Sequence, residues 1–315
     1  MNAVRVPWSS ASFLLYLGGL TVLASGVAYL AVEAGETGDF GFVLWSGLVL
    51  AIFAAFAEGF RRTGHAVAAG LFALSTVVAI VAFAGAIEEW FGWLPADSDS
   101  VFGGFRVSFL LLELLLFVAS LVALRRFRFP LLAGVAAASG WFFVTDFLSG
   151  GGGWTAIVTI AVGLVLLLVA LGLDAGASSP SAFWPHVVAG FTIGGGLLWF
   201  FHDGSFDWIL IGIAALLYIS LGDRLMRSSW AVLGAWGLLQ VTSHFADKWA
   251  GTSLGEFFPL SILLFPFFGF GEDGNGPARP WAAPLSYALV GFVFVGLGLL
   301  IARRRRDLLP AAELL

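Results

Sequence analysis

Polar side chains that could do chemistry are few in this chain, and most of them fall near the ends of apolar segments. His202 and Asp203 lie in the stretch FHDGSFDW at 201–208. Gln240 and His244 are four positions apart, so a helix would place them on one face. Imidazole and carboxylate groups can bind a divalent cation or relay protons. The complete set, which we call the outer polar cluster, is Asp146, His202, Asp203, Asp207, Gln240, His244 and Asp247.

A structural interpretation of the outer polar cluster is simpler. Helix ends routinely carry polar residues, and aspartate supports tight turns that contain glycine. The sequence has no metal-binding motif such as HExxH. If a metal is bound, His202, His244 and Asp247 are the ligands we expect. A haem held by His202 and His244 is disfavoured because it would lie near the membrane surface. We therefore predict no cofactor.

Glu113 is the most informative single residue. It lies in RVSFLLLELLLFVASLVALRR, flanked on both sides by leucine, at a depth where a charged residue costs about 2.5–3.5 kcal/mol on insertion scales. Arg106 lies seven positions earlier on the same helical face and could reach partway towards it. One interpretation is a proton-binding group that serves transport. The other is a neutral glutamic acid that hydrogen-bonds to a serine or threonine of a neighbouring helix.

The composition identifies the elements that must position these residues. Hydrophobic residues make up 60% of the 315 positions, charged residues only 11%, and mean hydropathy is +0.97, whereas soluble domains are about 25% charged. We predict an all-α, polytopic integral membrane protein. The absence of cysteine excludes disulfides, thiolate metal sites and cysteine nucleophiles. Ten apolar segments are long enough to span a bilayer: 11–32, 41–60, 65–88, 106–124, 130–149, 154–173, 183–201, 206–221, 229–246 and 281–302.

Arginine placement predicts the orientation of these ten spans. With the N-terminus in the cytoplasm, twelve of the fifteen basic residues fall on the cytoplasmic side, which satisfies the positive-inside rule. Both termini are then cytoplasmic, in a cell membrane. The apolar segment 253–271 contains Pro259 and Pro266 and would invert the RRRR run at 303–306 if it crossed. We therefore expect it to stay on the extracytoplasmic side. His65 and His186 fall at cytoplasmic helix starts, where we expect interfacial side chains.

The chain also contains an approximate internal repeat. Residues 1–128 form a predicted repeat unit A, 129–180 a central hairpin, and 181–308 a repeat unit B that includes the segment 253–271. The cytoplasmic turns support this division because Glu58 matches Asp223 and Arg62 matches Arg227. Both units start inside and have four spans, so they would be parallel repeats within a single membrane domain, 1–315.

The region 14–94 resembles a large group of uncharacterised bacterial multi-span membrane proteins. The shared features are the YLGG opening, the acidic loop between the first two spans, the RRTG turn and a third helix that closes on EEWFGW. That group has no established activity, so the resemblance implies topology and no catalytic residue.

Three classes of function remain. The first is a permease or channel-like protein for a small solute or ion, indicated by Glu113 and the stripe of polar residues on 229–246. The second is a membrane-embedded scaffold or assembly partner for another protein, and the third is an intramembrane metal-dependent hydrolase built on the outer polar cluster. The lipid bilayer is the expected surrounding in each case. Nucleic acid is excluded as a partner because basic residues are too few and too dispersed.

Overall fold

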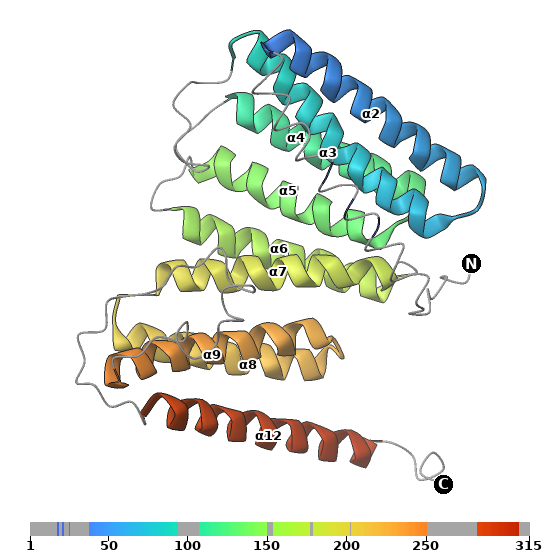
Figure 1. The fold of residues 1–315 in the computed structure, drawn as a ribbon. Helices are drawn as coiled ribbons and strands as arrows, with labels where there is room; N and C mark the ends of the chain where they lie inside the picture. The colour runs from blue at the N-terminus through green and yellow to red at the C-terminus, as the bar shows by residue number, and fades with distance from the viewer. Residues whose placement is uncertain are drawn as a thin grey trace. The chain divides into compact units, whose positions relative to one another are not determined.

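The structure of the protein, a computed structural model, describes residues 38–93, 107–149, 154–176, 179–201, 203–250 and 282–308, together with Gly18, Thr21 and Ser25. Every regular element in these ranges is an α-helix, as predicted (Figure 1). The helices are α2 (Gly38–Arg62), α3 (Ala66–Trp90), α4 (Val107–Phe127), α5 (Pro130–Ser149), α6 (Thr155–Ala175), α7 (Ser179–Phe200), α8 (Ser205–Arg224), α9 (Ser228–Ala250) and α12 (Ala282–Leu308). The expected first span, apart from three residues, and the segment 253–271 lie outside the described ranges.

Seven of the described helices, α2 to α8, are long and apolar enough to cross a membrane. Their bounds agree closely with seven of the predicted spans. The predicted spans 229–246 and 281–302 are also helical, as α9 and α12. The apolar part of α12, Ala288–Ile301, is shorter than a membrane span. The membrane class is thereby supported, while the count of ten spans remains a prediction.

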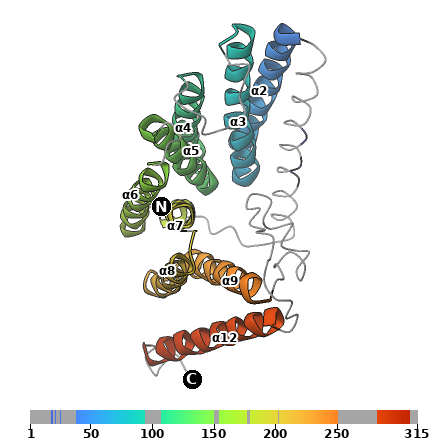
Figure 2. The same cartoon turned by 90° about the vertical axis from the view of Figure 1, so that its left-hand side faces the viewer.

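The chain divides into two compact units, Met1–Gly196 and Leu197–Leu315, and the boundary falls within α7. In the first unit each helix from α2 to α6 packs on the next one in sequence (Figure 2). Short turns make α2 antiparallel to α3 and α4 antiparallel to α5. In the second unit α8 packs on α9, and α12 also contacts α9. The predicted division into repeat units A and B is a separate hypothesis and remains one.

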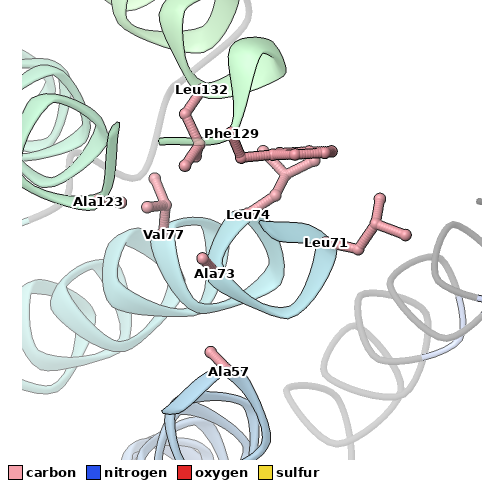
Figure 3. Close-up of a cluster of buried hydrophobic side chains, with 8 residues drawn as sticks. All are labelled: Ala57, Leu71, Ala73, Leu74, Val77, Ala123, Phe129 and Leu132. Carbon is pink, nitrogen blue, oxygen red and sulfur yellow. The ribbon is translucent and has the colours of Figure 1, made fainter. Parts of the chain in front are cut away.

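A buried cluster holds the ends of α2 to α5 together in the first unit. Side chains of α3, Leu71, Ala73, Leu74 and Val77, lie between Ala57 of α2, Ala123 of α4 and the start of α5 (Figure 3). Phe129 enters this cluster from the turn before α5. A Cβ atom on Gly70 would lie 2.3 Å from its ring, so only glycine lets the ring approach α3 so closely. The cluster brings Glu58, next to Ala57, to the same end of the unit as Arg126.

The turns that follow α2 and α8 share one backbone geometry. Gly64 and Met226 adopt left-handed φ angles of +82° and +54°. In each turn the next amide bonds a carbonyl of the preceding helix: His65 N–H to Phe60 O at 2.9 Å, and Arg227 N–H to Gly222 O at 3.0 Å. Superposing the turns on this geometry pairs Arg62 with Arg224, not with Arg227. The sequence match of Arg62 with Arg227 therefore differs from the match that the turn geometry gives.

Candidate functional site

Two carboxyl groups, carried by helices that are apolar enough to cross a membrane, meet between α4 and α5. Glu113 lies six residues inside the start of α4, about 9 Å along the axis at 1.5 Å per residue, and Asp146 lies three residues before the end of α5. Because these helices are antiparallel, both positions fall in the same half of the unit. The two carboxyl groups are within hydrogen-bonding reach of each other. This carboxyl pair was not expected from the sequence, which assigned the two residues to different groups.

One oxygen of each carboxyl group of the pair is buried without a hydrogen bond among the described residues. Asp146 is 9% exposed and Glu113 is half-buried. Glu113 Oε2 and Asp146 Oδ1 are buried and accept no hydrogen bond from any other described side chain or backbone amide. A carboxylate is only an acceptor, so two carboxyl groups can bond to each other only when one of them carries a proton. The geometry therefore favours a pair that shares a proton.

The other charged groups near the carboxyl pair are acidic as well. Within the described ranges, the half of α3 to α7 that contains the pair carries no lysine, arginine or histidine. Helix α3, which packs on α4, contributes Glu88 and the exposed Glu89 near its end, and Glu88 Oε2 is buried without a hydrogen bond. No three histidine, aspartate or glutamate side chains of the described residues gather in a metal-binding group. Glu88 therefore does not form a metal-binding group with Glu113 and Asp146.

Close packing one turn deeper allows the two carboxyl groups to meet. Phe117 follows Glu113 by one helical turn, and its ring lies against Gly140 of α5. A Cβ atom on Gly140 would be 3.1 Å from the ring of Phe117. The absence of a side chain at this position brings α4 and α5 together just below the pair. Arg106, the partner suggested by the sequence, lies outside the described residues.

A second buried polar pair joins α6 and α7. His186 Nε2 lies 2.8 Å from Asp174 Oδ2, and the His186 side chain is fully buried. The prediction that His186 is interfacial is therefore wrong: α7 begins at Ser179, so His186 lies about two turns inside the helix, facing α6. Neighbouring contacts confirm how closely these helices approach, because a Cβ atom on Gly163 would be 2.5 Å from Thr192 Oγ1. In the sequence, this pair could have been suspected only because Asp174 and His186 lie on either side of the short connection between two predicted spans.

Two described members of the outer polar cluster in the second unit, Asp207 and His244, make defined local contacts. Asp207 Oδ2 accepts a hydrogen bond of 3.1 Å from the Gly204 amide and so caps the start of α8. The His244 ring stacks on Trp208, with centroids 4.6 Å apart and planes 11° from parallel. Asp203 is exposed and Gln240 is half-buried. His202 and the side chain of Asp247 lie outside the described residues, and so the proposed metal ligands are not tested as a set.

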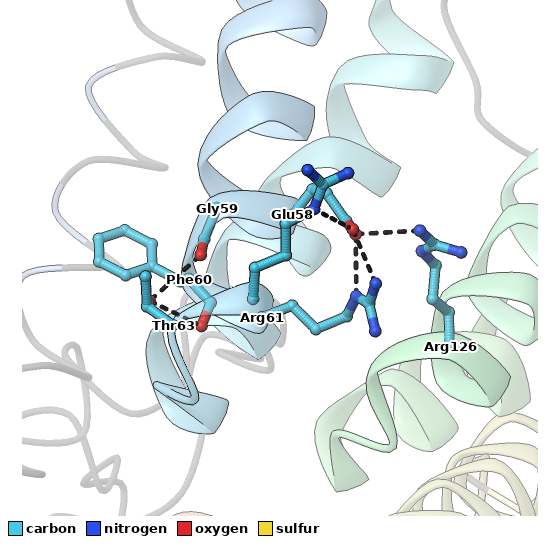
Figure 4. A network of polar contacts seen from close by, with 7 residues as sticks. Glu58, Gly59, Phe60, Arg61, Thr63 and Arg126 are labelled. Atoms are coloured by element: carbon cyan, nitrogen blue, oxygen red, sulfur yellow. Dashed lines mark hydrogen bonds and ion pairs between the residues drawn. The ribbon is translucent and has the colours of Figure 1, made fainter.

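Glu58 is surrounded by arginine at the opposite end of the first unit. Arg61 donates to both of its oxygens, at 2.7 and 2.9 Å, while Arg62 and Arg126 each donate one hydrogen bond of 3.0 Å (Figure 4). Arg126 comes from α4, so this arginine cluster joins the ends of α2 and α4. We call this end of the unit, which also carries Arg125 and Arg128, the arginine end.

Comparison of the whole chain with protein-family models, curated proteins and solved structures finds no match. The resemblance of 14–94 to uncharacterised bacterial membrane proteins therefore remains a prediction. The geometry of the first unit is the basis for any functional proposal.

Proposed function

We propose that this chain is a proton-coupled permease or channel-like protein for a small solute or ion, and that the carboxyl pair is its proton-binding site. The observation that carries the proposal is the direct approach of Glu113 to Asp146 with no cation or other donor beside them among the described residues. An ionisable residue inside a membrane is expensive to insert. Two that face each other are harder to explain as packing than one alone.

The coupling follows from simple electrostatics. With one shared proton the two groups attract each other and hold α4 against α5. Loss of that proton leaves two like charges at hydrogen-bonding distance, and these repel. Proton release therefore favours a state in which the two helices separate near the pair, whereas proton binding favours the packed state. Access for a small solute beside α4 and α5 would then depend on whether the proton is bound.

The orientation of the protein is part of the same proposal. The positive-inside rule assigns the arginine end to the cytoplasm of a cell membrane, with both termini on that side, and places the carboxyl pair nearer the outside. Cysteine labelling tests this directly because the chain has no native cysteine. With an impermeant thiol reagent on intact cells, cysteine at Ser98 or Asn275 should react and cysteine at Ser228 should not. Labelling at Ser228 but not at Ser98 would reverse the orientation.

The carboxyl pair is tested in proteoliposomes with an imposed pH gradient. Proton flux is followed by a trapped pH indicator, with and without a panel of small ions and solutes on one side. We expect the wild-type protein to dissipate the gradient, and Glu113→Gln or Asp146→Asn to slow it at least about tenfold, the scale expected when a proton carrier is removed. The amides keep the shape and hydrogen-bonding capacity of the acids but cannot exchange a proton.

Glu89→Gln is the matched control for this experiment. It removes an acidic group from the same unit, but Glu89 is exposed. We expect wild-type flux from it. Flux from Glu113→Gln and Asp146→Asn equal to that of Glu89→Gln, in protein that retains its fold, would contradict the proposal. The scaffold and hydrolase alternatives have no specific structural observation in their favour.

A further inference from the structure

The arginine cluster has more positive charge than its single carboxylate can balance. Three guanidinium groups share Glu58, which leaves two unit charges in excess. The Glu58 side chain is 24% exposed, whereas those of Arg62 and Arg126 are 75% and 55% exposed. Each of these two arginines uses one nitrogen on Glu58, so its other N–H groups point to the surroundings. Glu58 therefore holds the guanidinium groups in place and leaves donors available to an anion.

An exposed apolar stripe on α4 leads to the arginine cluster. Leu114, Val118 and Val122 are 38%, 47% and 61% exposed, and they follow one another at four-residue spacing. Arg126 is the next position on this stripe. Residues four apart lie on one helical face, so a continuous apolar track ends at a guanidinium group that Glu58 orients.

An exposed track on α2 ends on a different face of that helix from Glu58, because Phe56 and Glu58 are two positions, or about 200°, apart. Leu44, Leu48, Ile52 and Phe56 are spaced by four and are 43–60% exposed. The α4 track is therefore the one that leads to the arginine cluster, and the end of a helix that could cross a membrane is where a bilayer would change from hydrocarbon to headgroups. A ligand that fits this arrangement has apolar chains and, at one end, a negatively charged phosphate.

We propose that the arginine cluster is a binding site for the headgroup phosphate of an anionic phospholipid, with an acyl chain lying along the exposed track of α4. Arginine forms paired hydrogen bonds with phosphate oxygens because its N–H groups form a planar fork. Glu58 acts as the positioning residue: it turns Arg62 and Arg126 towards one place. The site is independent of proton coupling and lies at the other end of the unit from the carboxyl pair.

Purified full-length protein in a neutral detergent provides the test. Native mass spectrometry or a fluorescent-lipid titration should show that phosphatidylglycerol binds more tightly than phosphatidylcholine. Arg62→Gln with Arg126→Gln should weaken phosphatidylglycerol binding by about tenfold, since each arginine near a headgroup contributes on the order of a few-fold to tenfold. Arg303→Gln with Arg305→Gln removes the same charge from α12 and should leave the affinity within about twofold, a small fraction of that effect.

Glu58→Gln separates an organised site from general charge attraction. This substitution makes the cluster more positive, so diffuse attraction would strengthen binding. In the proposed site it releases Arg62 and Arg126 from their orientation, and binding should weaken by a few-fold. Tighter binding by Glu58→Gln would overturn the proposal. Equal stabilisation of the protein by inorganic phosphate would also overturn it, because the site would then recognise a free anion instead of a lipid.

Discussion

Glu58 and the carboxyl pair present the same chemical group in two opposite surroundings. Glu58 lies at a helix end and accepts four hydrogen bonds from three arginines. Glu113 and Asp146 lie inside the membrane-spanning helices and have only each other among the described residues. A carboxylate near water can keep its charge because long cationic side chains reach it there. Charge inside the bilayer is costly, and one shared proton lowers the charge of the pair from two negative units to one without any further residue.

Asp174 lies between these extremes. It pairs with the imidazole of the fully buried His186, at 2.8 Å. The three sites therefore differ in the kind of partner beside each carboxyl group: arginine, histidine or a second carboxyl group. That difference predicts how strongly each site responds to substitution and whether the response appears as activity or as stability.

The largest effect is expected from a double-mutant cycle on the carboxyl pair. Glu113→Gln, Asp146→Asn and the double variant should each reduce proton flux by a similar factor of at least about ten, because residues that act as one unit are non-additive. Proton flux in proteoliposomes measures this. Glu58→Gln, measured in parallel, should retain flux within about twofold, a change well under 1.4 kcal/mol. Losses that multiply in the double variant would mean that the two carboxyl groups function separately.

A smaller effect should follow from separating the pair without altering it. Gly140→Val places a side chain where the Phe117 ring lies, 3.1 Å from the new Cβ atom. Such overpacking costs about 1–3 kcal/mol and should move α4 away from α5. Thermal unfolding in detergent and proton flux should both decrease. Gly172→Val is the control, because nothing lies within 4 Å of its Cβ position. Equal behaviour of the two variants would show that contact at Gly140 does not position the pair.

Substitution of Asp174 should reduce stability more than activity. Asp174→Ala removes a hydrogen-bond partner from a buried histidine, which costs about 1–3 kcal/mol. Asp174→Asn retains an acceptor and should recover most of that loss. Thermal unfolding of both variants measures the difference. If Asp174→Asn instead abolishes proton flux while folding normally, the Asp174–His186 pair belongs with the carboxyl pair and not with structural contacts.

The smallest effect is expected from Glu58→Gln on thermal stability. Its ion pairs are accessible to water, and exposed pairs contribute little because solvent and salt screen them. We expect a small decrease in melting temperature that shrinks further at high salt. A large decrease that is insensitive to salt would show that the arginine cluster is needed to hold α2 against α4.

The hydrophobic pattern along each chain segment was sufficient to predict the described helices. Hydrophobic runs of about 20 residues predicted α2 to α8 within a few residues of their bounds, because a helix satisfies its own backbone and depends little on distant residues. The turn at Gly64 was also evident from RRTG. A turn between 206–221 and 229–246 was also predicted, but its left-handed residue, Met226, was not, since a non-glycine residue rarely adopts a positive φ. A residue match based on charge therefore aligned the two turns at the wrong positions.

The sequence by itself predicted an all-helical chain with helices apolar enough to cross a membrane, the extent of the described helices and the place of Glu113 within an apolar run. Hydropathy and the helical rise specify these quantities along one chain segment at a time. Only the tertiary structure decided that Glu113 faces Asp146, that His186 is buried on Asp174, and that Arg126 reaches Glu58. Helical periodicity says which residues share a face but not which helix that face meets. In these apolar helices almost every face is hydrophobic, so small residues such as Gly140 and Gly163, which permit close approach, select the neighbour.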